Sequence, residues 1–185
     1  MKKLFLSTFL ILGMLKADSI GLNVNSEDFE LRGTVDINNV IGNYGSGIAY
    51  ELSGSYLHTE NDDLFKAGFS ASSPLSGAEG LTLTFGLEAV FMDSYVAMPL
   101  FGQAALRLPL DEPIPATSLI ARVDYAPSVL SFIDADNYLE YRFEADMEVI
   151  SNIHLFGGYR NIDTNYDAYD YTLNDSWYGG LRISF

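Results

Sequence analysis

The chain has 185 residues, enough for one domain, and it combines 48% hydrophobic residues with a formal net charge of −15 and no cysteine. The lack of cysteine excludes disulfides, thiolate metal sites and thiol catalysis. The acidic balance argues against nucleic acid as a partner, because phosphates require a basic binding surface.

The first residues have the features of a secretory signal. Lys2 and Lys3 precede the apolar run "LFLSTFLILGML" at 4–15, and Ala17 is a small residue at a suitable cleavage point. The run is shorter than the roughly 20 residues that a membrane-spanning helix needs, although an uncleaved anchor remains the alternative. We therefore predict a signal peptide over 1–17, whose removal takes away three lysines and lowers the net charge from −15 to −18.

From residue 19 onward, apolar and polar residues alternate with the period of two that is typical of strands with two different faces. In 138–149, for example, Leu139 and Tyr141 share one face, whereas Glu140 and Arg142 share the other. The predicted strands are 19–25, 29–37, 46–57, 63–72, 80–92, 97–108, 117–126, 138–149, 152–162 and 176–185. The count is about ten, or eight if the weak first pair merges or another prediction fails.

The connections suggest an all-β, antiparallel, up-and-down transmembrane β-barrel over 18–185. If the first strand runs outward, the longer segments 126–137 and 163–175 fall on the outer side, and the turns at 109–113 and 149–152 fall on the inner side. Short inner turns with longer outer loops are typical of outer-membrane barrels.

Alternation alone does not show which face points inward, because a soluble barrel or sandwich also alternates. The placement of the charged residues does indicate it. All seven basic residues after residue 17 fall mid-strand on the polar face, together with several acids. Charges enclosed in a narrow lumen must be paired, because the desolvation cost of an unpaired ion is several kcal/mol. The predicted lumen charge network comprises Glu30, Arg32, Glu51, Lys66, Glu88, Arg107, Arg122, Asp124, Glu140, Arg142, Glu144, Arg160 and Arg182.

The chain ends on the alternating strand "SWYGGLRISF" at 176–185. This strand must pair with the first one, so that no sheet edge is left in hydrocarbon. The spacing of Gly180, Ile183 and the terminal Phe185 resembles the C-terminal signal by which the barrel-assembly machinery recognises outer-membrane barrels.

Chain length limits the width of the barrel. A spanning strand takes about 9–11 residues, and a porin with an aqueous lumen needs about sixteen strands. Ten strands leave a narrow interior filled by side chains, so the sequence excludes a wide diffusion pore.

Two stretches, "YAPSVLSFIDADNYLEYRFEADMEV" at 125–149 and "GYRNIDTNYDAYDYTLNDSWYGGLRISF" at 158–185, resemble the YfaZ family of bacterial outer-membrane proteins. A looser likeness runs through 54–69. The resemblance implies an outer-membrane barrel of a Gram-negative bacterium. It implies no activity and no catalytic residues.

Candidate catalytic residues are few. His58 with nearby carboxylates could activate water, as in a barrel protease, or could pair with Ser53 or Ser55 in a hydrolase acting on lipid A. The sequence supplies no second acid–histidine pair close by, so we expect no catalytic residues and no cofactor.

The segment "DTNYDAYD" offers Asp163, Asn165 and Asp167 at the spacing that opens a calcium loop, but Ala168 and Asn174 replace the expected turn glycine and final glutamate. We therefore predict at most weak binding of a divalent cation there. The predicted outer loops carry many acids and no lysine or arginine, which suggests that divalent cations bridge the protein to lipopolysaccharide.

The sequence thus predicts a small monomeric outer-membrane barrel with a structural or surface-interaction role. The alternative is a narrow, cation-preferring channel, because the lumen is net acidic. A barrel enzyme that acts on lipid A or peptides comes third.

Overall fold

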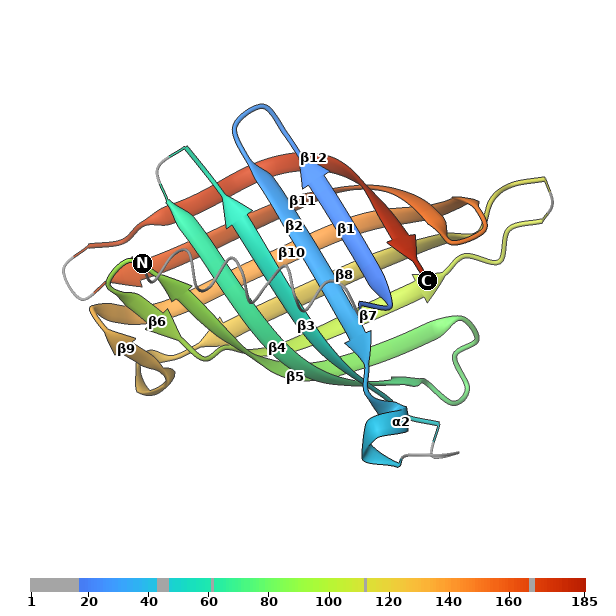
Figure 1. Cartoon of the computed structure of the whole chain (residues 1–185), viewed down its shortest axis with the longest axis horizontal. Coiled ribbons are helices and arrows are strands. Elements are labelled where there is room, and N and C mark those ends of the chain that lie inside the picture. The colour runs from blue at the N-terminus through green and yellow to red at the C-terminus, as the bar shows by residue number, and fades with distance from the viewer. Residues whose placement is uncertain (1–16, 43–46, 61, 112, 167–168) are drawn as a thin grey trace.

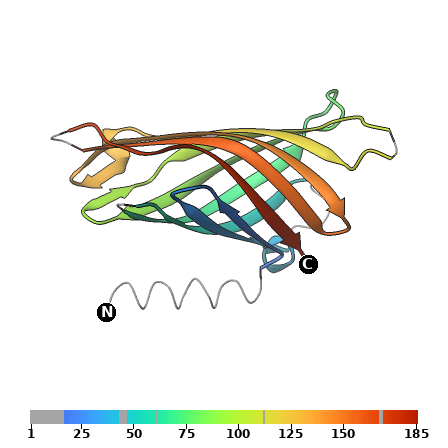
Figure 2. The same ribbon diagram turned by 90° about the horizontal axis from the view of Figure 1, so that it is seen from above.

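The computed structural model describes residues 17–42, 47–60, 62–111, 113–166 and 169–185. They form an antiparallel sheet that closes on itself (Figures 1 and 2). Among these residues, no helix has the length and apolar character needed to cross a membrane.

Ten strands make the closed ring, as predicted. They are β1 (Ser19–Val24), β2 (Phe29–Asp36), β3 (Ala49–His58), β4 (Asp63–Pro74), β5 (Leu81–Met92), β7 (Leu100–Arg107), β8 (Thr117–Ala126), β10 (Ala135–Ile150), β11 (Ile153–Tyr166) and β12 (Thr172–Ser184). Each pairs with its neighbours in chain order, and β1 pairs with β12 from Ser19↔Ser184 to Val24↔Gly179. The first and last strands therefore close the barrel, so that none of the ten has a free edge within it.

Two short strands and two short helices complete the described chain. Strands β6 (Tyr95–Ala97) and β9 (Ser131–Ile133) extend the pairing beyond β5, and a 3₁₀ turn, η1 (Ser128–Leu130), precedes β9. Helix α2 (Asn38–Ile41) lies at the opposite end (Figure 1). We call the end with β6 and β9 the outer end, and the end with α2 and the C-terminus the inner end.

Three predicted boundaries were wrong. The strand predicted at 97–108 is interrupted between β6 and β7, where Pro99 has no N–H to donate to a ladder. The predicted loop 126–137 contains η1, β9 and the first residues of β10. The predicted loop 163–175 is mostly strand, because β11 and β12 continue their pairing to Asp163↔Thr172 through a bulge.

The apolar and polar faces point in opposite directions. Leu119, Val123 and Leu181 are about half exposed on the outer surface, at 47%, 51% and 50%. Glu140 and Arg160, in contrast, are fully buried inside. Such an inverted distribution suits a barrel whose surface contacts lipid, since no solvent-facing surface would expose a continuous apolar band.

Candidate functional site: the barrel interior

Inward-facing charges gather midway along the barrel. Alternation turns every second side chain inward, so that Glu140, Arg142 and Glu144 project together from β10. Other strands add further charges around the ring, namely Glu30 and Arg32 from β2, Lys66 from β4, Glu88 from β5, Arg122 and Asp124 from β8, Arg160 from β11 and Arg182 from β12. The result is one connected set of ion pairs, which we call the charge layer.

Glu30 is the centre of this layer. Its carboxylate, 1% exposed, accepts hydrogen bonds from Arg142 at 3.1 Å for both Nη atoms, from Arg160 Nη1 at 2.7 Å and from Asn23 Nδ2 at 2.8 Å. Arg32 Nε lies 3.2 Å away. One carboxylate thus holds three guanidinium groups that come from β2, β10 and β11.

A second group of pairs lies against β4, β5 and β8. Lys66 forms an ion pair with Glu140 and lies 3.8 Å from Glu88. Arg122 Nη2 contacts both Glu88 and Asp124 at 2.6 Å. Glu140 also accepts a hydrogen bond from Arg142 at 2.9 Å, which joins this group to the Glu30 group.

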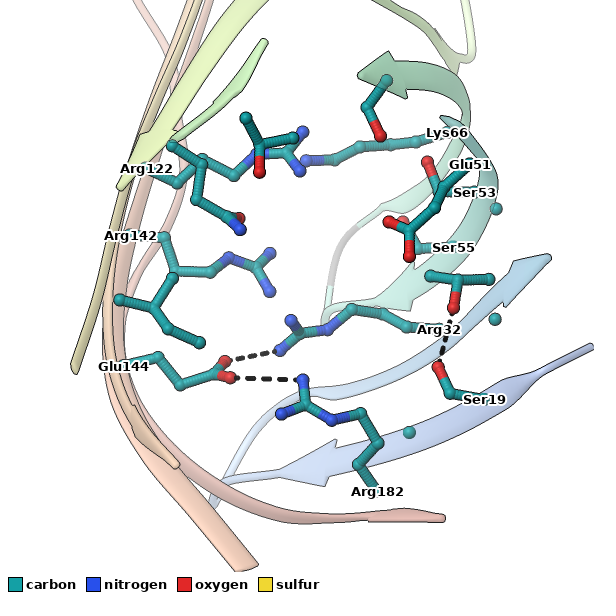
Figure 3. Close-up of a pocket in the computed structure, with 18 of the residues that line it drawn as sticks. Ser19, Arg32, Glu51, Ser53, Ser55, Lys66, Arg122, Arg142, Glu144 and Arg182 are labelled. Atoms are coloured by element: carbon teal, nitrogen blue, oxygen red, sulfur yellow. Dashed lines mark hydrogen bonds and ion pairs between the residues drawn. The ribbon is translucent and has the colours of Figure 1, made fainter. Parts of the chain in front are cut away.

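A third group lies toward the inner end. Arg32 and Arg182 approach Glu144 from two strands, at 3.2 and 3.9 Å (Figure 3). Arg182 also pairs with Asp146, whose other oxygen lies 2.8 Å from His154 Nδ1. The charge layer therefore continues from mid-barrel toward the inner opening.

Aromatic rings fix several of the guanidinium groups. The Arg122 guanidinium lies 3.7 Å from the centre of the Phe101 ring. That of Arg32 lies 5.3 Å from the ring of Phe156 and 5.9 Å from that of Tyr178. Cation–π attraction of this kind strengthens when it is shielded from water.

The structure brings together all the residues predicted for the charge network except Glu51 and Arg107. Arg107 is exposed at the end of β7 and Glu51 faces the interior, and neither forms an ion pair with the described residues. Asp28 and Asp146 belong to the layer and were missed. Asp28, predicted as a loop acid, hydrogen-bonds Asn25 at 2.9 Å and lies 3.9 Å from Arg160.

An apolar cluster fills the interior between the charge layer and the outer end. Its members are inward-facing residues and lid residues, namely Leu57, Leu64, Val90, Tyr95, Ala97, Ala126, Ala135, Tyr138, Ile162 and Leu173. Leu57, Leu64, Val90 and Ile162 are at most 1% exposed, so that water reaches them from neither end. We call this cluster the outer seal.

The interior is open on the other side of the charge layer. A cavity of about 530 Å³ extends from Glu30 and Glu140 to Asp18, Asp36 and Ser184 at the inner end. We call it the inner chamber. Seven carboxylates and five lysine or arginine side chains line its wall, so that the lining is net acidic.

Comparison with known proteins identifies the family of this barrel. The family model described as "YfaZ precursor" matches residues 1–185. The chain belongs to the YfaZ family. No curated protein matches it.

Solved porins resemble the YfaZ barrel in fold. The KdgM porin is 7% identical over 90% of this chain and 98% of that one, with a TM-score of 0.50. The NanC porin is 10% identical over 90% and 97% of the two chains, with a TM-score of 0.40. The likeness to the KdgM porin establishes a small porin-like β-barrel and, at this identity, says nothing about solutes.

The structure separates the hydrolase candidates. Ser53 and Ser55 line the inner chamber, whereas His58 lies on the outward face of β3. There it is 2.8 Å from Asp63, with its ring tilted against Phe29 and stacked with Tyr56. His58 therefore cannot activate either serine in this arrangement.

The cation candidates are engaged in other contacts. Asp163 accepts a hydrogen bond from Thr172 at 2.7 Å, and Asn165 bonds Asn137 at 3.2 Å. Asp167 lies outside the described residues. Among those residues, no group of three or more histidine or acidic side chains is placed to hold a metal ion.

The residues of the C-terminal signal lie at the seam of the barrel. A β-carbon on Gly180 would collide with the carbonyl oxygen of Leu22 and with the Phe156 ring. Ile183 pairs with Ile20, and the backbone N–H of Phe185 donates to the carbonyl of Asp18 at 2.8 Å. Phe185 itself is 77% exposed.

Proposed function

We propose that this protein is a monomeric outer-membrane barrel with a structural or surface-interaction role, without catalysis and without an open pore. The observation that carries the proposal is the outer seal, which fills the interior with tightly packed apolar side chains. The apolar outer surface and the precursor family support the outer membrane as its location.

The seal opposes conduction for a physical reason. An ion crossing the seal would lose its hydration among aliphatic and aromatic side chains, at a cost of several kcal/mol or more. Below the seal, the fully buried Arg160, Asp124 and Glu140 form ion pairs with Glu30, Arg122 and Lys66, respectively, so the charge layer offers no continuous water path.

Planar-bilayer recording of the refolded protein tests this proposal. We expect no steady conductance from the wild type. The variant Leu57→Ala/Leu64→Ala removes two facing side chains of the seal and should introduce conductance steps. The matched control is Leu52→Ala/Phe69→Ala, a facing pair from the same two strands that is exposed on the outer surface. This control should stay silent, and frequent discrete steps from the wild type would overturn the proposal.

The second candidate is a narrow, cation-preferring channel. The net acidic inner chamber favours it, because carboxylates in excess raise the local concentration of cations. Cation-selective steps from the wild type in the same recording would establish this alternative in place of the sealed barrel.

The surface-interaction role rests on the outer acids. Glu27, Glu60, Asp134, Asp170 and Asp175 are exposed at the outer end. We propose that divalent cations bridge them to the phosphates of lipopolysaccharide. Removing divalent cations with EDTA should lower the thermal midpoint in lipopolysaccharide bilayers and leave it unchanged in phosphatidylcholine bilayers. Equal midpoints with and without EDTA in lipopolysaccharide would reject the bridge.

A further inference from the structure

The wall of the inner chamber formed by β3, β4 and β5 differs from the rest of its lining. It presents short hydroxyl side chains, Ser53, Ser70 and Thr84, between two carboxylates, Glu51 and Glu88. The guanidinium group of Arg142 and the carboxylate of Glu144 project from the other side, facing Glu51 across the cavity, whereas Arg32 projects from β2, the strand next to β3 (Figure 3). We call the first wall the hydroxyl wall.

The two carboxylates of this wall differ in depth, and each can accept further hydrogen bonds. Glu88, 5% exposed, uses Oε1 on Arg122 at 2.6 Å, but its Oε2 accepts no hydrogen bond from the described residues and has only Lys66 at 3.8 Å. Glu51 forms no ion pair with the described lysines and arginines. The register also sets Glu51 directly opposite Asp36 on β2, an arrangement of like charges that costs stability.

Gly68 leaves room in this wall for two neighbouring side chains. A β-carbon there would lie 2.6 Å from Ser53 Oγ and 2.9 Å from Glu88 Cγ, so that both side chains lean over the bare backbone of β4. Ser53 therefore lies beside the deep carboxylate, two positions along β3 from Glu51. Hydroxyl side chains therefore lie between Glu51 and Glu88.

The spacing of the two acids suits a ligand with two cationic ends. Glu51 faces Ser70 on β4, which in turn faces Gly86 on β5, two residues from Glu88. Two strand spacings and two residue rises place their backbones about 12 Å apart, and the inward-pointing side chains reduce the gap between the carboxylates. A volume of about 530 Å³ lies within the range of small-molecule sites.

The charges already present in the chamber indicate whether a ligand should be cationic or anionic. Each lysine and arginine on the chamber wall has at least one carboxylate partner, whereas Glu51 forms no ion pair with the described residues and one oxygen of Glu88 accepts no hydrogen bond from them. An anionic ligand would have to displace existing ion pairs. A cation can bind Glu51 and the second oxygen of Glu88 without breaking a hydrogen bond between described residues, although at Glu88 it would share that oxygen with Lys66.

We propose that the inner chamber binds a small linear organic diamine, with one ammonium group at Glu88 and the other at Glu51, and with the hydroxyl wall along its chain. The site rests on the proposed function only in that the outer seal leaves the inner opening as its entrance. Each ammonium supplies three donors, which matches carboxylate and hydroxyl acceptors. Simple aliphatic monoamines reach only one of the two acids.

Isothermal titration of the refolded full barrel in detergent micelles tests this site, with 1,4-diaminobutane and 1,5-diaminopentane as probes. We expect saturable binding with one site, at least tenfold weaker for butylamine. Glu51→Gln should weaken diamine binding at least tenfold, and this variant keeps every ion pair of the charge layer. Glu60→Gln, an exposed acid at the outer end, is the matched control and should bind as the wild type does.

The outcomes separate this site from the proposed function. No saturable heat with either diamine, equal affinity for butylamine, or equal weakening by Glu60→Gln would overturn the site. Gly68→Ser, which places a side chain between Ser53 and Glu88, provides a second variant and should also abolish binding, with folding checked by heat-modifiable gel migration. Conductance by the wild type in planar bilayers would overturn the seal but leave the titration result standing.

Discussion

Neutralising Glu30 is the sharpest perturbation of the charge layer. Glu30→Gln keeps the shape of the side chain but removes the negative charge that three guanidinium groups share. Arg142 retains Glu140 at 2.9 Å, whereas Arg160, fully buried, retains only a neutral bond to Asn174 at 2.9 Å and Asp28 at 3.9 Å. Removing one partner of a buried pair costs about 3–5 kcal/mol. The folded-to-unfolded ratio should therefore fall by about two to three and a half powers of ten.

Urea unfolding in phospholipid vesicles measures this loss, with the fluorescence of Trp177, the single tryptophan, as the signal. Glu27→Gln, an exposed acid in the turn next to β2, is the control and should change the free energy of unfolding by no more than about 0.5 kcal/mol. Adding Arg160→Gln to Glu30→Gln should recover part of the loss, since it removes the stranded cation. A loss below about 1 kcal/mol for Glu30→Gln, or strict additivity in the double variant, would refute the reasoning.

Two further predictions concern closure and orientation. Gly180→Ala should lower stability by about 1–3 kcal/mol, because its methyl group overpacks the seam against Leu22. Gly179→Ala, whose methyl group would make only an ordinary contact at 3.9 Å, should be tolerated. Equal unfolding midpoints of the two variants in heat-modifiable gels would contradict this. Val123→Arg, outward on β8, should cost about 2–4 kcal/mol of stability in vesicles if it lies near the bilayer midplane. Ile114→Arg, in the inner connection before β8, should cost little. Similar urea midpoints for the two variants would count against an apolar face that contacts lipid.

The sequence predicted the ring of strands because its alternation is nearly uninterrupted. The inward positions of β10 read Glu140, Arg142 and Glu144, so that periodicity and charge agree on which face is enclosed. Pairing partners within the layer were beyond reach, because Glu30 and Arg160 meet only when β1 and β12 close the barrel.

The outer seal was missed although its signal is present in the sequence. Leu57, Leu64, Val90 and Ile162 occupy inward positions near the outer ends of four strands, where the charged pattern predicts polar residues. Four such departures at one level of the barrel indicate an apolar plug once the strand register is known.

Outer strand ends were missed for a related reason. Asp163 and Asn165 resemble loop residues, but a strand that projects beyond the bilayer needs no apolar outer face, and β11 continues through Tyr166. Asp28 lies in the turn between β1 and β2, as predicted, but its carboxylate was not expected to reach the outer side of the charge layer near Arg160.

Because the chain has no cysteine, single cysteines carrying nitroxide labels can report which face meets lipid. Labels at Leu119 and Leu181, on the outer surface, should be accessible to oxygen and shielded from a water-soluble nickel complex in vesicles. A label at Gln103, in the inner chamber, should show the reverse. Nickel access at Leu119 and Leu181 together with oxygen access at Gln103 would contradict the account, because it would place the charges toward water and the apolar band around a buried core.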